Sequence, residues 1–148
     1  MGIVVNQCLD LSVADLLEHL ELETSSAISQ QRILAGGPVQ RDHGFVLHRG
    51  DPLWEDSLAV SEDICLTASK DVLRAIATGE GPETFLIALG YAGWAAGQLE
   101  AEMAENSWLT VPADPATLFE HAPEERLAAA GWKLGVNIDL LSAEAGHA

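Results

Sequence analysis

The feature that most constrains the fold is an unbroken apolar run that ends in a cluster of glycines. Residues 85–89 contain no polar side chain, which is typical of a strand buried on both faces. Gly90, Gly93 and Gly97 follow directly, and the sequence from 97 to 105 has the pattern of a helix. Glycines at such a junction permit a positive φ or the close approach of two backbones. The junction therefore predicts either tight backbone packing or a ligand-binding turn, and both interpretations stay open at this point.

Composition narrows the classes of protein to which the chain can belong. It has 148 residues, of which 48% are hydrophobic, enough for one domain with a real core. No apolar stretch approaches the roughly 20 residues of a membrane helix, and the start lacks a basic signal region. We therefore expect a cytoplasmic protein without a membrane anchor. Cys8 and Cys65 are far apart with no metal or redox spacing, so we expect two reduced thiols.

The charge balance argues against nucleic acid as a direct partner. Asp and Glu outnumber Lys and Arg by 23 to 7, which gives a formal net charge of −16. A surface of that sign repels a phosphate backbone. It remains compatible with a basic protein partner.

The sequence predicts a mixture of strands and helices. Strands are expected at 2–6, 32–35, 45–48, 57–60, 64–67, 85–89 and 107–111, and helices at 13–20, 70–78, 97–105, 115–120 and from Pro123 onward. Ser12, Ser69 and Asp114 are the expected N-caps, Gly79 ends the second helix, and Gly131 or Gly135 ends the last. Residues 21–31 are expected to form an exposed loop and 142–148 a frayed tail.

Candidate site residues come from glycines, scarce cations and two aromatics beside the glycine turn. Arg32, Arg41 and Arg49 are three of only seven Lys and Arg residues. If Arg41, His48, Arg49 and Lys70 converge near the turn, they would bind a small anion or an acidic peptide by charge-assisted hydrogen bonds. The competing interpretation is ion pairing with the abundant carboxylates. The predicted ligand-binding residues are Gly36, Gly37, Arg41, His48, Arg49, Ser69, Lys70, Tyr91, Gly93 and Trp94.

No catalytic set, cofactor site or metal site is predicted. The glycines match neither a phosphate loop nor a dinucleotide fingerprint. His43 and His48 would point to opposite faces of a strand, and their spacing fits no zinc motif. Ser69 and Lys70 are adjacent on a helix and do not face each other, so Ser69 is better explained as a cap.

Several of these segments together resemble the AlgH/YqgE family of bacterial proteins. They are Gly36-Gly37-Pro38-Val39, Gly44-Phe45-Val46-Leu47-His48-Arg49, Ser69-Lys70-Asp71 and the stretch from Gly90 to Glu100. The resemblance covers nearly the whole chain and implies an α+β fold. It implies a single domain over 1–141, with a mixed, twisted, barrel-like sheet and helices packed around it.

The resemblance also implies a difference at the N-terminus. Family members usually carry further strands before the point that matches Met1. We expect that the start codon has been chosen too late. The alternative is a sheet that lacks these strands and self-associates through its open edge.

The leading functional hypothesis is a cytoplasmic, non-enzymatic binding or regulatory protein. Its surface around 36–49, 69–71 and 91–94 would bind a small anionic ligand or a protein segment, and any effect on transcription would be indirect. The alternative is an enzyme acting on a small anionic substrate, with His48 as acid or base and Lys70 or Arg49 stabilising the anion. Direct regulation by DNA binding is a third class, which the charge disfavours.

Overall fold

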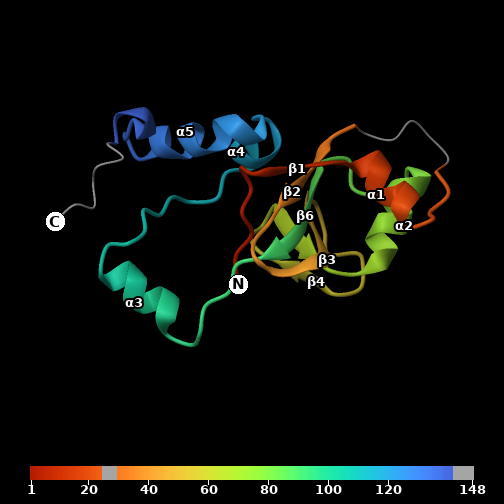
Figure 1. Cartoon of the computed structure of the whole chain (residues 1–148), viewed down its shortest axis with the longest axis horizontal. Helices are drawn as coiled ribbons and strands as arrows, with labels where there is room; N and C mark the ends of the chain where they lie inside the picture. Colours follow the sequence, from red (N-terminus) through yellow and green to blue (C-terminus); the bar gives the residue numbers. More distant parts are fainter. Residues whose placement is uncertain (25–29, 142–148) are drawn as a thin grey trace. The chain divides into compact units, whose positions relative to one another are not determined.

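The computed structural model describes residues 1–24 and 30–141, which form two compact units that meet in the sequence at Gly93 and Trp94. The first unit contains β1 (Cys8–Ser12), α1 (Val13–His19), β2 (Arg32–Ala35), β3 (Val39–Arg49), β4 (Ser57–Ala59), β5 (Ile64–Thr67), α2 (Lys70–Thr78) and β6 (Phe85–Tyr91) (Figure 1). The second contains α3 (Gln98–Ala104), α4 (Pro115–Phe119), α5 (Pro123–Lys133) and the 3-10 turn η1 (Ile138–Leu140). The single domain over 1–141 stays a prediction, and the predicted frayed tail at 142–148 lies outside the described residues.

The strands of the first unit form one mixed sheet. Their order is β1-β2-β6-β3-β5-β4, so β1 and β4 are its edges. β2 and β6 run parallel, whereas every other neighbouring pair is antiparallel. Leu86, Ile87 and Ala88 of β6 are buried, which confirms the prediction of a strand covered on both faces. The α+β class and the mixed sheet are also confirmed.

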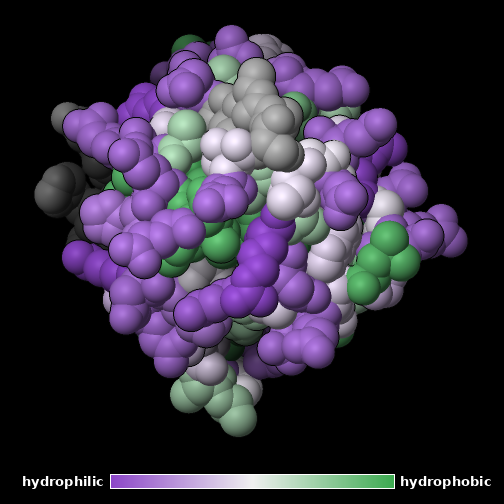
Figure 2. All heavy atoms as spheres, turned by 90° about the vertical axis from the view of Figure 1, so that its right-hand side faces the viewer, coloured by the Kyte–Doolittle hydropathy of each residue, from purple (hydrophilic) through white to green (hydrophobic). Residues whose placement is uncertain are grey.

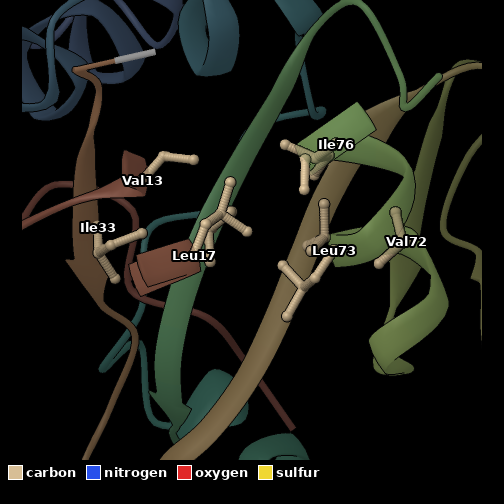
Figure 3. Packing of buried hydrophobic residues seen from close by; sticks show 9 residues of the cluster. Val13, Leu17, Ile33, Val72, Leu73 and Ile76 are labelled. Atoms are coloured by element: carbon tan, nitrogen blue, oxygen red, sulfur yellow. The ribbon is translucent and has the colours of Figure 1, made fainter. Parts of the chain in front are cut away.

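The main core lies where α1 and α2 cover one face of this sheet. Val13 and Leu17 of α1 lie beside Ile33 of β2, and Val72 and Ile76 of α2 belong to the same buried cluster (Figure 3). Leu73 of α2, Val46 of β3 and Ile87 of β6 belong to the same cluster. Apolar side chains recur on α2 at the spacing of one helix face, and burying that face stabilises the short helix. The face shown in Figure 2 is dominated by hydrophilic residues, with apolar side chains in small separate areas.

The predicted helix caps are largely confirmed. The Ser12 hydroxyl accepts from the Asp15 amide at 3.1 Å, and the Asp15 carboxylate accepts from the Ser12 amide at 3.0 Å, which completes a capping box. Gly79 ends α2 with a φ of 78°, a left-handed value that suits glycine. Ser69 stands at the N-cap of α2, but its hydroxyl donates to the Asp71 carboxylate and accepts no backbone hydrogen bond. Ser69 is therefore the N-cap by position, as predicted, but its side chain makes no capping hydrogen bond to the helix backbone.

Two predicted strands are absent from the described structure. Residues 2–6 form only an isolated bridge, between Gly2 and Ala92, and the regular strand lies at β1 instead. Residues 107–111 have no assigned secondary structure. Both segments are rich in apolar or β-branched residues, but a strand also needs a neighbour with which to form a ladder.

The three helices predicted for the second unit are present, within about one residue of the predicted bounds. The Asp114 carboxylate accepts from the Ala116 amide and caps α4, with Pro115 at the first helical position. α5 ends at Lys133, and Gly135 follows in a left-handed conformation with a φ of 71°. Gly135, and not Gly131, therefore ends the last helix.

Candidate functional site

The glycines after β2 lie directly against the glycine at the end of β6. A Cβ on Gly36 would stand 2.3 Å from the Gly90 carbonyl oxygen, and a Cβ on Gly90 would stand 2.4 Å from the Gly37 carbonyl oxygen. Both distances are far below any van der Waals contact, so a side chain at either position would push the backbones apart. Gly90 also has a φ of 79°, which disfavours any residue with a Cβ. These glycines therefore serve a close backbone approach, which we call the glycine corner (Gly36, Gly37 and Gly90).

A bulge in β3 follows the glycine corner. Val39 pairs with Tyr91 and Gly44 with Leu89, so five steps along β3 match two steps along β6. Gln40, in the bulge, has a φ of 46°. A left-handed conformation costs a non-glycine residue about 1–2 kcal/mol, and bulges often redirect a side chain beside a binding site. Here the bulge carries Arg41.

A cavity of about 400 Å³ lies beside the corner and the bulge. It is lined by Leu9, Ala35, Gly37, Pro38, Arg41 and Leu89. Ala35 and Leu89 pair with each other across β2 and β6. Each lies two residues beyond a fully buried core isoleucine of its own strand, and each is only half-buried. The cavity therefore lies at the carboxyl ends of the two parallel strands.

Arg41 is the cation that the structure brings to this cavity. Its side chain is exposed and makes no ion pair with any residue of 1–24 or 30–141. Arg32 pairs with Asp10 at 3.8 Å, and Arg49 pairs with Asp63 at 4.0 Å. Most exposed pairs of this kind contribute little to stability, but they do satisfy these two cations.

Lys70 lines a different hollow. This hollow, about 130 Å³ in volume, is bounded by Leu20, Leu22, Lys70, Leu73 and Arg74. The structure thus brings Gly37 and Arg41 together at one cavity and places Lys70 at another.

His48 is 0% exposed and hydrogen-bonded at both ring nitrogens. Nδ1 lies 3.1 Å from the carbonyl oxygen of Arg49, and Nε2 lies 2.9 Å from Thr67 Oγ1. A carbonyl only accepts, so Nδ1 carries a proton; in the neutral imidazole, Nε2 then accepts from the Thr67 hydroxyl. Thr67 Oγ1 is then free to accept from Ser57 Oγ, at 2.7 Å. The Trp54 ring stands edge-on to the imidazole at 5.2 Å, so the surroundings of His48 are those of a satisfied core residue.

The remaining predicted residues lie around the end of β6 and at the start of the second unit. The Tyr91 ring is half-buried against Phe45, with centroids 5.8 Å apart. Gly93 is exposed, with only the Tyr91 ring near its missing Cβ, at 3.6 Å. Trp94 belongs to the second unit.

A carboxylate in the second unit binds two indoles, which the sequence did not indicate. Glu102 accepts from Trp108 Nε1 at 2.8 Å and from Trp94 Nε1 at 3.0 Å. Gln98 donates to the same carboxylate at 3.1 Å. These donors, Trp108 foremost, lower the pKa of Glu102 because they favour its ionised form.

Sequence reasoning missed most of the apolar lining of the cavity. Leu89 belongs to the apolar run at 85–89, whose pattern predicts a core position and not the wall of a cavity. Leu9 was overlooked because the first strand was placed at 2–6. Gln40 carries no sequence signal for a left-handed conformation, since such bulges depend on how two strands pair.

Other kinds of site find no support in the described residues. Within 1–24 and 30–141, no three His, Cys, Asp or Glu side chains gather so as to hold a metal ion. Among the same residues, no helix has both the length and the apolar character to cross a bilayer. Cys65 is buried and Cys8 half-buried, and both are free thiols.

The fold and site together define a small α+β protein with a cavity at the open end of a mixed sheet. Comparison with known proteins identifies the family. A model of the AlgH-like family matches residues 1–139, and the chain belongs to that family. A UPF0301 protein of Saccharophagus degradans is 51% identical over 148 residues, covering 100% of this chain and 73% of the relative. UPF0301 protein AlgH of Pseudomonas aeruginosa is 53% identical over 150 residues, covering 100% and 79%.

Solved structures agree with this assignment. The solution structure of the AlgH protein from Pseudomonas aeruginosa matches with a TM-score of 0.77 at 52% identity, covering 100% of this chain and 79% of that one. The crystal structure of protein DIP2367 from Corynebacterium diphtheriae matches with a TM-score of 0.61 at 13% identity, covering 85% and 68%. The second likeness shows a shared fold alone.

Proposed function

We propose that this protein is a non-enzymatic binding protein whose ligand is a small anion held in the cavity beside the glycine corner. The observation that carries the proposal is Arg41, an exposed guanidinium with no ion pair to a described residue, at an otherwise apolar cavity. Carboxylates are abundant in this chain, yet none of the described ones pairs with Arg41. Its guanidinium, at a concave site, is therefore available to a ligand. Guanidinium binds anions through charge-assisted hydrogen bonds.

The regulatory part of the proposal follows from charge. With a formal net charge of −16, the protein is repelled by nucleic acid at long range. An influence on transcription would therefore pass through a ligand or a protein partner in the cytoplasm, and not through contact with DNA.

The non-enzymatic part of the proposal rests on the surroundings of His48. A general acid or base must reach the substrate within hydrogen-bond distance. The imidazole is fully enclosed, and both of its nitrogens already have partners. Its geometry supports a structural role.

A thermal-shift titration of the full chain with acetate, inorganic phosphate and citrate tests the proposal. A ligand that binds only the folded state stabilises it by about 2.7 kcal/mol at a hundredfold excess over Kd. At least one anion should raise the melting temperature of the wild type. Arg41→Gln should abolish the shift. Arg49→Gln is the matched control, because Arg49 is an exposed cation of the same strand that does not line the cavity.

Two results would overturn the proposal. One is that none of the three anions stabilises the protein and that propanoate, butanoate, hexanoate and octanoate do not stabilise it either. The other is a shift of equal size in the wild type and in Arg41→Gln.

A further inference from the structure

The walls of the cavity specify more than an anion. Leu9, Ala35, Pro38 and Leu89 are apolar, and the remaining lining residues are Gly37 and Arg41. Leu9 and Leu89 also pack against the core under α1 and α2, so the apolar wall is held by buried structure. A volume of about 400 Å³ lies within the range of about 300–1,000 Å³ that small-molecule pockets occupy. The ligand should therefore present an apolar body to four of the six lining residues.

The charge of the site limits the charge of the ligand. Among the described residues that line the cavity, Arg41 alone is charged. One cation neutralises one negative charge, and each further charge on the ligand meets the field of a molecule with a formal charge of −16. A phosphate monoester carries about −1.5 to −2 at neutral pH. A carboxylate carries a single charge and matches the planar guanidinium fork with two parallel hydrogen bonds.

The backbone fixes the point on β3 from which the Arg41 side chain projects. The glycine corner joins the end of β2 to the end of β6 at contact distance, and the bulge with Gln40 in a left-handed conformation follows at once. The register shift occupies the stretch between Val39 and Gly44, and Arg41 lies within it. A strained backbone conformation persists where surrounding structure imposes it, and ligand sites are a common place for it.

Resting on the proposed function, we propose that the cavity binds a monocarboxylate with a short aliphatic body. The carboxylate pairs with Arg41, and the hydrocarbon body packs against Leu9, Ala35, Pro38 and Leu89. The ligand class thus excludes nucleotides, polyphosphates and di- or tricarboxylates.

Isothermal titration of the full chain with a matched series of compounds tests the ligand class. Propanoate, butanoate, hexanoate and octanoate vary the body, and hexanol, hexylammonium and hexyl phosphate vary the head group. Affinity should rise by up to about fourfold for each added methylene until the cavity is filled. Hexanoate should bind more tightly than hexyl phosphate, and hexanol should bind at least tenfold more weakly than hexanoate.

Arg41→Gln separates recognition of the charge from burial of the body. Loss of a charge-assisted hydrogen bond should weaken hexanoate by about 10- to 100-fold. It should change the binding of hexanol little, because the apolar wall stays intact. Arg49→Gln, which leaves the cavity untouched, should keep the wild-type affinity for hexanoate. Arg41 is exposed, so its replacement should leave the fold intact. A denaturation curve of Arg41→Gln that coincides with that of the wild type verifies this.

The outcomes distinguish this inference from the proposed function. If acetate, phosphate or citrate binds in an Arg41-dependent way at least as tightly as hexanoate, the ligand class is overturned while the small-anion function stands. If affinity does not rise with chain length, the role of the apolar wall is overturned. If no anion of either series binds, both proposals fail.

Discussion

Replacing Gly90 by alanine should destabilise the first unit more than its backbone conformation alone explains. A left-handed φ costs an alanine about 1–2 kcal/mol relative to glycine, and Gly90 has a φ of 79°. The new methyl would also stand 2.4 Å from the Gly37 carbonyl oxygen and 3.1 Å from that of Val39. Forcing extra volume into packed structure costs about 1–3 kcal/mol. We therefore expect a loss of about 2–5 kcal/mol in the free energy of unfolding.

Gly50 provides the matched control in the same unit. Its φ is 98°, and a Cβ there would meet no described atom within 4 Å. Gly50→Ala should therefore cost only the conformational part, about 1–2 kcal/mol. The difference between the two variants measures the steric part of the glycine corner.

Urea denaturation followed by tryptophan fluorescence measures both variants. The free energies are compared where the slopes with denaturant agree with the wild type, so that the difference reports native stability. If Gly90→Ala costs no more than Gly50→Ala, the close approach between β6 and the segment after β2 contributes nothing, and the reasoning is refuted. Should Gly90→Ala fail to accumulate while Gly50→Ala folds normally, the steric interpretation is supported.

Three further substitutions test other contacts. Thr67→Val should cost about 1–3 kcal/mol in urea denaturation, because it leaves the buried Nε2 of His48 without its donor; an unchanged midpoint would contradict this. The capping box lowers the pKa of Asp15, chiefly through the hydrogen bonds from its serine partner. The ionised carboxylate therefore stabilises the folded state fully above the unfolded pKa of about 4. This stabilisation is lost as pH falls through the lower pKa of the folded state. Asp15→Asn should therefore be less stable than the wild type at neutral pH and equal to it in strong acid; a gap that persists in acid would count against the capping box. Hydrogen bonding from the indole of Trp108 lowers the pKa of Glu102, so acid titration should change tryptophan fluorescence below the usual glutamate range of about 4.3; the same change in Glu102→Gln would assign it to another group.

Local sequence determined many of the elements. The capping box at Ser12 and Asp15 places the start of α1, because the two side chains satisfy backbone groups within one turn. Gly79 and Gly135 end their helices because both need left-handed φ values. The apolar run before Gly90 identified a central buried strand, since no polar side chain would have to be paired there. The sequence motifs also indicated the AlgH/YqgE family, and the family model that matches residues 1–139 confirms it.

The site needed long-range information. The unsuccessful strand predictions at 2–6 and 107–111 rested on β-propensity, whereas a strand forms only against a partner that the sequence does not identify. His48 and Lys70 were grouped with Arg41 by charge, but pairing between β3 and β5 encloses the imidazole, and α2 places Lys70 at another hollow.

The sequence by itself therefore determined the class of fold, the family, the formal net charge and the positions of most helix ends, because each depends on composition or on contacts within a few residues. Only the tertiary structure decided that Gly36, Gly37 and Gly90 meet, that β3 bulges at Gln40 and that Arg41 lines an apolar cavity beside Leu9 and Leu89. Those facts depend on which strands become neighbours and in what register. Register is fixed by the sum of many side-chain contacts across the sheet and not by any one segment.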